Sequence, residues 1–361
     1  MDVRELVGQA RQGRPRAVAR LISLVENAVE NAENAAKAAN SARPAGSAGP
    51  AGSAGSAGPA GSAGSAGGDP AAPAAASRAL REAMAALATG AARAHPARVI
   101  GLTGSPGVGK STSTGMLIRA FRKRGSTVGV LAVDPSSPFT GGALLGDRVR
   151  MQDHATDPGV FIRSMSSRGH LGGLAWATPQ ALRVLEAAGC DVILVETVGV
   201  GQAEVEIARL ADTTVVILAP GMGDGVQAAK AGILEVADVL VVNKADRDGV
   251  QATVRELRNM TGLVETPWRP PIVTTVASKG EGADDLMAEL DKHQAYLEES
   301  GEARRRRLAR ARDEIEAIAL AQLRSRFAVL HGDRLDALAE RLLGAQTDPY
   351  AAADDLIAAL R

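Results

Sequence analysis

The chain has 361 residues, of which 45% are hydrophobic and only 2% aromatic, and its 41 basic and 41 acidic residues give a formal net charge of zero. A chain of this length can bury one large core with smaller helical additions. The balanced charge excludes a global basic field that would attract nucleic acid or an anionic membrane.

Three further features of the sequence indicate the cellular compartment in which the protein works. Cys190 is the single cysteine, so an internal disulfide is excluded. No apolar run approaches the roughly 20 residues that span a bilayer, and the first ten residues, MDVRELVGQA, lack a charged-then-apolar export signal. We therefore expect a cytoplasmic protein with no membrane partner and no nucleic-acid partner.

Residues 1–40 are predicted to form an N-terminal helical segment. The apolar positions at helical spacing are Val18, Leu21, Ile22 and Val25. Residues 41–77 are almost wholly Ala, Gly, Ser and Pro, with glycine at every third position from Gly46 to Gly67. Collagen would need many more triplets and denser proline, so we interpret this tract as a disordered linker.

After a helix predicted for residues 77–94, apolar runs alternate with amphipathic segments, and we assign residues 78–300 to one domain. Strands are predicted at 98–104, 127–134, 160–164, 191–196, 213–219, 239–243 and 271–276, and helices at 111–125, 178–189, 202–212 and 225–238. Near-continuous apolar strands between helices are typical of a mainly parallel sheet covered on both faces. The predicted class is α/β, with helical extensions at both ends.

The last segment, residues 301–361, is predicted to be helical. Its apolar stripe has to pack against a surface of its own domain or of a second subunit. Its apolar stripe comprises Leu308, Ile315, Ala319, Leu323 and Leu330. We interpret the Arg304–Arg307 run as a solvated face, because a nucleic-acid patch would want interleaved aromatic residues.

The stretch GSPGVGKS fits the phosphate-binding pattern G-x-x-x-x-G-K-[ST] and lies between a predicted strand and a predicted helix. Its glycines let backbone N–H groups converge on an anion at a helix N-terminus. Lys110 is expected to reach the β- and γ-phosphates and Ser111 to ligate Mg²⁺. The predicted phosphate-binding residues are Gly104, Ser105, Pro106, Gly107, Val108, Gly109, Lys110, Ser111 and Thr112.

An acidic residue, Glu196, ends the predicted strand DVILVE, where a water molecule of Mg²⁺ can be held. Gly199 follows and can offer its backbone N–H to a γ-phosphate. This segment is a candidate sensor of the γ-phosphate.

The nucleotide base is addressed by a motif after a later strand, Asn243-Lys244-Ala245-Asp246. The Asp246 carboxylate can accept the N1–H and N2–H groups of guanine, which adenine does not present together. The motif therefore favours GTP over ATP. Val276, Ala277 and Ser278 follow the last strand, and the backbone N–H groups of Ala277 and Ser278 are expected to face the guanine O6.

Three longer stretches carry a family resemblance: AVDPSSPFTGGALLGDRVRM, FIRSMSSRGHLGGL and VETVGVGQAEVEIARLADTTVVILAPGMGDGVQAAKAGILEVADVLVVNKAD. They resemble the methylmalonyl-CoA mutase-associated GTPases, the MeaB family, a branch of the metallochaperone-like P-loop GTPases. The resemblance runs from about Arg98 to the chain end. The family commonly has Ser-Ala where this chain has Val276-Ala277, which affects only a side-chain role.

The resemblance implies a homodimeric GTPase, with residues 301–361 as its dimerisation segment. It implies a G-protein chaperone that gates adenosylcobalamin loading and protects or reactivates an acyl-CoA mutase that uses this cofactor, such as methylmalonyl-CoA mutase. It places Asp134 and Asp147 in a first switch near Mg²⁺, Glu196 at the start of a second, and Asp224 and Lys230 in a third, residues 219–230. The implied catalytic residues are Lys110, Asp134, Asp147, Glu196 and Lys230, and the implied Mg²⁺ ligands are Ser111, Asp134, Asp147 and Glu196.

Three alternatives share some of these features. A nickel-type metal-insertion GTPase would need soft or imidazole ligands, whereas the five histidines and one cysteine form no C-x-C, C-x-x-C or H-x-H cluster. We interpret His170 as a switch-loop or interface residue. A kinase or ATPase serving basic amino-acid transport is disfavoured by Asn243–Asp246, and a dimerisation module by the whole nucleotide pattern. We expect Mg²⁺ with GTP or GDP and no protein-bound transition metal.

Overall fold

The computed structural model describes residues 2–41, 72–89, 96–134, 154, 156–166, 177–197, 203–221, 234–262, 266–330 and 332–358. Most of the predicted linker and the predicted third switch lie outside these ranges. The chain divides into two compact units, one of residues 1–26 and 82–314 and one of residues 27–81 and 315–361. Each unit is described by itself below.

A seven-stranded parallel sheet forms the centre of the first unit, in the order β3-β2-β4-β1-β5-β6-β7. Its strands are β1 (Arg98–Thr103), β2 (Val128–Asp134), β3 (Val160–Ser166), β4 (Val192–Thr197), β5 (Thr213–Leu218), β6 (Val239–Asn243) and β7 (Ile272–Thr275). All seven predicted strands are present, and the predicted α/β fold with a parallel sheet is confirmed.

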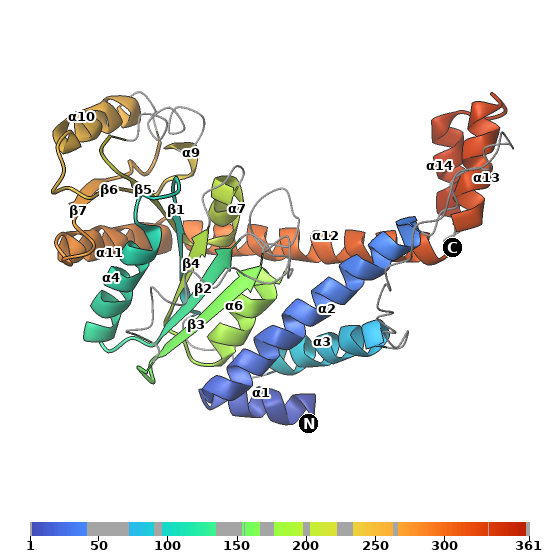
Figure 1. The fold of residues 1–361 in the computed structure, drawn as a ribbon, viewed down its shortest axis with the longest axis horizontal. Coiled ribbons are helices and arrows are strands. Elements are labelled where there is room, and N and C mark those ends of the chain that lie inside the picture. The colour runs from blue at the N-terminus through green and yellow to red at the C-terminus, as the bar shows by residue number, and fades with distance from the viewer. Residues whose placement is uncertain are drawn as a thin grey trace, which may run out of the picture. The chain divides into compact units, whose positions relative to one another are not determined.

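Helices cover both faces of the sheet (Figure 1). They are α4 (Lys110–Lys123), α6 (Thr178–Ala187), α7 (Ala203–Leu210), α9 (Leu234–Val236), α10 (Val250–Thr261) and α11 (Ala283–Glu299). On one face, Leu102 of β1 packs in a core with Met116 of α4 and Leu286 of α11. On the other, Val216 of β5 packs with Leu257 of α10. Burial on both faces explains why the strands are almost entirely apolar.

The N-terminal helices are α1 (Val3–Arg11), α2 (Pro15–Ser41) and α3 (Ala72–Ala88). Helix α3 begins at Ala72, inside the tract interpreted from the sequence as a linker, whereas the predicted helix began at Ser77. Alanine has the highest helix propensity and proline is tolerated in the first turn, so this Ala- and Pro-containing tract can start a helix. Within the first unit, Arg163 of β3 bonds Ser23 of α2 at 3.0 Å and pairs with Glu26.

The C-terminal helices are α12 (Glu302–Leu330), α13 (Gly332–Leu343) and α14 (Pro349–Ala358). The solvated-face interpretation of Arg304–Arg307 holds for Arg304 and Arg305, which are exposed, and is wrong for the other two. Arg306 pairs with Asp238 at 2.8 Å and Arg307 with Asp212 at 3.4 Å. The two carboxylates are buried just before β6 and β5, so they need cationic partners.

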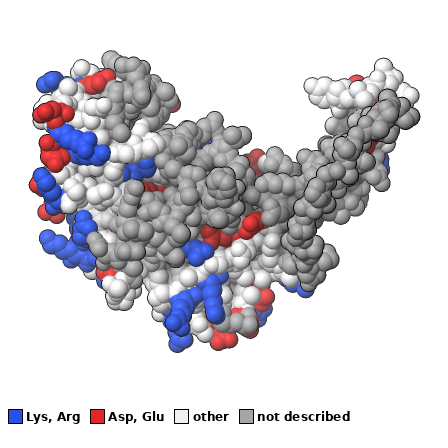
Figure 2. Space-filling view, in the orientation of Figure 1, with Lys and Arg blue, Asp and Glu red and all other residues white. Residues whose placement is uncertain are grey.

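Both signs of charge occur side by side over the described part of the face drawn in Figure 2, in keeping with the zero net charge. Among the helices as far as they are described, none has both the length and the apolar character to cross a membrane.

Candidate nucleotide-binding site

The predicted nucleotide-contacting segments meet at one edge of the sheet. Because all seven strands are parallel, their carboxyl ends share this edge. Thr103 of β1 leads into the glycine-rich loop, Glu196 lies at the end of β4, and Asn243 ends β6. Ligands of open α/β sheets bind at the carboxyl edge, so the topology brings these segments to the expected place.

Two glycines of the loop are required by close approach of the chain. Gly104 has φ 141°, and a Cβ there would lie 2.1 Å from the carbonyl oxygen of Ile217. Gly109 has φ 98°, and a Cβ there would lie 2.4 Å from Nδ2 of Asn243. At both positions a side chain is disfavoured for two reasons: the positive φ, and the clash that its Cβ would make with a neighbouring atom.

Helix α4 begins directly after Gly109, and no side chain caps its first turn. The backbone N–H groups of a helix's first turn lack intrahelical partners and carry the positive end of the helix dipole. The loop therefore offers converging donors to an anion, as the pattern predicts.

Lys110, the first residue of α4, is buried at 8% exposure. Its Nζ donates to the carbonyl oxygens of Gly104 at 2.7 Å and Ser105 at 3.1 Å. The ammonium group is thus held over the loop whose N–H groups are predicted to bind phosphate, where it can add a point charge to those neutral donors.

The hydroxyl of Ser111 donates to Oε1 of Glu196 at 2.6 Å, and that of Thr114 donates to Oε2 at 2.8 Å. Ser111 and Glu196 are both buried. A hydroxyl and a carboxylate are hard oxygen ligands of the type that Mg²⁺ binds, directly or through water. The residues present therefore fit a Mg²⁺ site. Thr114 was missed by sequence reasoning, although its position one helical turn after Ser111 was a signal.

Asn243 ties three segments of the site together. Its Nδ2 donates to the carbonyl of Val108 at 2.8 Å, and its Oδ1 accepts from the N–H of Ala277 at 3.0 Å and the hydroxyl of Thr275 at 3.1 Å. The asparagine is buried and so holds the phosphate loop beside the segment after β7. Because Ala277 donates to Asn243, Ser278 is the better placed of the two to donate to a base.

Lys244 has φ 58°, one of two positive φ values at non-glycine residues in the described part of the chain. Such backbone conformations cost energy and cluster at functional sites. Its Nζ donates to the carbonyl of Gly107 at 2.5 Å, which adds a second link between the β6 end and the phosphate loop.

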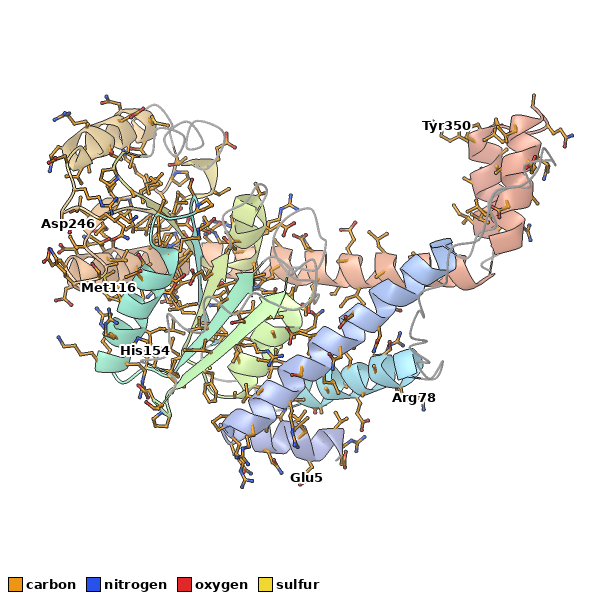
Figure 3. All side chains as sticks on the ribbon, in the orientation of Figure 1. Glu5, Arg78, Met116, His154, Asp246 and Tyr350 are labelled. Atoms are coloured by element: carbon orange, nitrogen blue, oxygen red, sulfur yellow. The ribbon has the colours of Figure 1, made fainter. Side chains whose placement is uncertain are left out.

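Asp246, labelled in Figure 3, has a half-exposed carboxylate that pairs with Lys279 at 3.5 Å. Lys279 lies next to Ser278, so the two segments predicted to contact the base are joined by this ion pair. Sequence reasoning missed Lys279. Val276 is buried, and its N–H donates to the carbonyl of Glu281 at 3.1 Å, which shapes the turn that carries Ser278.

The predicted switch residues are placed only in part. Asp134 ends β2, whose Val133 is in register with Thr197 of β4, so its backbone lies at the carboxyl edge; its side chain lies outside the described part. Asp147, Gly199 and Lys230 lie wholly outside the described residues. Their roles stay predictions.

Comparison with solved structures supports the fold. A crystal structure titled as that of an LAO/AO transport system kinase has a TM-score of 0.64, is 22% identical, and the alignment covers 99% of this chain and 97% of that one. At this identity the similarity concerns the fold alone.

Several curated proteins are similar in sequence. A protein of Pyrococcus abyssi (strain GE5 / Orsay) that carries the name of a GTPase is 49% identical over 267 residues, which cover 72% of this chain and 82% of that protein. The GTPase ArgK of Escherichia coli (strain K12) is 40% identical over 56% of this chain and 63% of its own length. The mitochondrial methylmalonic aciduria type A homolog of Mus musculus is 38% identical over 56% of this chain and 50% of its own.

A family model described as "Methylmalonyl Co-A mutase-associated GTPase MeaB" matches residues 71–330, which include the phosphate loop, Glu196 and the segment from Asn243 to Asp246. The match spans well over half of the chain, and the chain therefore belongs to the MeaB family of P-loop GTPases.

Proposed function

We propose that this GTPase is a G-protein chaperone of an adenosylcobalamin-dependent acyl-CoA mutase, with methylmalonyl-CoA mutase as the first candidate. It hydrolyses GTP to GDP and phosphate, gates the loading of adenosylcobalamin and protects or reactivates the mutase. Membership of a mutase-associated family supports the choice of partner. The observation that supports the nucleotide assignment is the hydrogen bonding of Asn243, which links Val108 of the phosphate-binding pattern to Ala277 after β7.

The residues at the carboxyl edge divide the recognition of GTP between them. The backbone of residues 104–112 and the ammonium of Lys110 bind the β- and γ-phosphates. Asp246 accepts the N1–H and N2–H groups of guanine, and the N–H of Ser278 donates to O6. When guanine binds, the Asp246 carboxylate has to face the base. The ion pair between Lys279 and Asp246 therefore has to break or change its geometry.

Ser111 and Glu196 hold Mg²⁺ in this proposal, and Asp134 and Asp147 complete its surroundings from the first switch. Bound Mg²⁺ neutralises negative charge on the β- and γ-phosphates. Glu196 accepts the hydroxyl proton of Ser111, so the oxygen lone pairs of Ser111 remain available to the ion.

The nucleotide state is passed to the mutase through segments at the same edge. The N–H of Gly199 donates to the γ-phosphate, and residues 219–230, with Asp224 and Lys230, form the segment that responds to the partner. Loops that contact a γ-phosphate can change order when it is lost. We propose slow intrinsic turnover that the mutase stimulates.

We propose that the protein is a homodimer, with a second copy covering the apolar side chains of residues 315–361 in the second unit. These exposed side chains are Ile315, Ile318, Leu320, Leu323, Leu335, Leu342, Leu343, Tyr350 and Ile357. Tyr350, labelled in Figure 3 on α14, is 84% exposed. Nine exposed large apolar side chains on three helices support an interface, because burying them against a second copy would remove their apolar surface from water. The working compartment proposed is the cytoplasm, in which a single cysteine stays reduced.

The test is turnover of GTP by the purified protein, alone and with candidate adenosylcobalamin-dependent acyl-CoA mutases, with ATP in parallel. We expect slow GTP turnover, a much weaker response to ATP, and stimulation by one mutase. Equal use of ATP would favour the transport-associated kinase or ATPase, and stimulation only by a nickel enzyme's apoprotein would favour the metal-insertion GTPase. GTP turnover that no mutase alters would refute the chaperone role and leave the GTPase.

A further inference from the structure

Two hydroxyl groups from one turn of α4 hold the carboxylate of Glu196. Ser111 lies 2.6 Å from one carboxylate oxygen and Thr114 lies 2.8 Å from the other. Residues three apart lie on the same side of a helix, so α4 presents both hydroxyls to β4 together. Ser111 has a proposed role as a Mg²⁺ ligand, whereas Thr114 has none.

The hydrogen bond from Thr114 to Glu196 is not the one that a threonine inside a helix makes by default. Such a hydroxyl commonly bonds the carbonyl four residues earlier, and the carbonyl of Lys110 is indeed 3.1 Å away. Thr114 has a single hydroxyl proton, and an ionised carboxylate only accepts. The carboxylate oxygen is the nearer of the two acceptors, at 2.8 Å against 3.1 Å, so it receives the hydroxyl proton.

Burial makes this bond matter for the direction of the carboxylate. Thr114 is 0% exposed and Glu196 is 4% exposed, so water offers little compensation for a lost donor. The terminal torsion of a glutamate side chain is broad and roughly two-fold, and therefore weakly fixed by its own rotamer preference. A donor on one oxygen fixes where the other oxygen points.

We propose that Thr114 is a positioning residue, which pins one oxygen of Glu196 so that the other stays beside Ser111, and thereby sets the Mg²⁺ affinity of the nucleotide complex. The proposal rests on the Mg²⁺·GTP site proposed above. Thr114 acts through Glu196 and contacts neither nucleotide nor metal in this role.

Two substitutions at the same position separate this role from packing. Thr114→Val keeps the branched shape and removes the hydroxyl, whereas Thr114→Ser keeps the hydroxyl and removes the methyl group. Positioning predicts that only valine impairs the site. A packing role predicts the reverse order, because a methyl group lost from a filled core leaves a cavity.

The experiment measures the Mg²⁺ dependence of binding of a fluorescent GDP analogue, together with its affinity in EDTA. Loss of one hydrogen bond between two buried groups predicts that Thr114→Val raises the Mg²⁺ concentration for half-maximal effect about tenfold. The affinity in EDTA should stay unchanged for both variants, and Thr114→Ser should stay within about twofold of the wild type throughout. Thermal unfolding checks folding, and Thr114→Ala, which also lacks the hydroxyl, replaces valine if that variant does not fold.

Three outcomes overturn the proposal: an unchanged Mg²⁺ dependence in the valine variant, a larger effect of serine than of valine, or an equal loss of affinity in EDTA. Failure of the proposed Mg²⁺·GTP site is detected separately, from the Mg²⁺ dependence of nucleotide binding by the wild-type protein. A wild-type protein whose guanine nucleotide binding does not depend on Mg²⁺ would refute the Mg²⁺ site itself, and the role of Thr114 with it.

Discussion

Arg306→Ala is expected to destabilise the first unit, because Arg306 neutralises a buried carboxylate. Asp238 is only 6% exposed and accepts two hydrogen bonds from the Arg306 guanidinium, at 2.8 and 2.9 Å. The same carboxylate accepts the N–H of Thr214 at 2.8 Å and lies 3.2 Å from Nε2 of His293. The variant therefore leaves a buried charge with fewer partners.

The size of the effect follows from burial. Removing one partner of a buried ion pair costs about 3–5 kcal/mol. The Arg306 side chain is 29% exposed, so water can enter in its place, and Thr214 and His293 remain. We expect a loss of about 2–3 kcal/mol, which corresponds to a fall in melting temperature of about 5–10 °C for a unit of this size.

Arg305→Ala is the matched control, one residue away on the same helix. Arg305 is 67% exposed and pairs with Glu302 at 2.6 Å. Exposed pairs contribute at most about 1 kcal/mol and commonly less. The assay is thermal unfolding followed by circular dichroism. Equal falls in melting temperature for the two variants, or no fall for Arg306→Ala, would refute the reasoning.

The acid dependence of this effect has a definite sign. Burial alone would raise the pKa of Asp238, but the neighbouring His293, 3.2 Å away, and the hydrogen bonds and positive charge of Arg306 outweigh it and lower the pKa below its ordinary value. The stabilisation by Asp238 is then fully present above the unfolded pKa of about 3.9 and is lost as the pH falls through the lower folded pKa. The difference in stability between the wild type and Arg306→Ala should therefore shrink below about pH 4.

Three other predictions concern the proposed function. Lys110→Ala should weaken binding of Mg²⁺·GTP by at least about tenfold, since it removes a charged phosphate donor; calorimetry giving equal affinity for it and for Arg119→Ala, an exposed change on the same helix, would contradict the site. Lys230→Ala should spare GTP binding but lower mutase-stimulated hydrolysis, and unaltered stimulation would remove it from the third switch. Leu343→Glu, at an 83% exposed position, should shift the dimer towards monomer in light scattering, whereas Val205→Glu, 47% exposed in the first unit, should not; a dimer in both would refute the proposed interface.

The sequence allowed the sheet to be predicted strand by strand because each strand is a near-continuous apolar run. Burial on both faces demands such runs, and seven of them separated by amphipathic segments leave little choice of class. The phosphate loop was equally readable, since Gly104 and Gly109 occupy positions that a side chain cannot. Strand burial and loop conformation each depend on a few consecutive residues, so both can be predicted from a short stretch of sequence.

Contacts between distant residues were not readable in this way. Arg306 and Asp238 are 68 residues apart, and Arg307 and Asp212 are 95 apart. The sequence of an arginine run does not indicate whether its side chains face water or pair with buried carboxylates. The available signal was the repeated Ala-Asp that precedes β5 and β6, in ADTTVVILA and ADVLVVN. An acid placed directly before a buried strand requires a partner, and α12 supplies it.

Strand β6 follows Asp238, the residue that anchors α12, and ends at Asn243, the first residue of the segment predicted to bind the base. All five of its residues are buried, and it is paired on both sides, with β5 and with β7. A strand paired along both edges has its position set by the ladder hydrogen bonds more than by one ion pair before its first residue. Loss of the Arg306 contact should therefore lower stability without moving Asn243, and GTP affinity of Arg306→Ala, measured well below its melting temperature, should stay within about twofold of the wild type. A larger loss would mean that the anchor of α12 and the nucleotide site are coupled through β6, since a shared element whose position both sites bias is what such coupling requires.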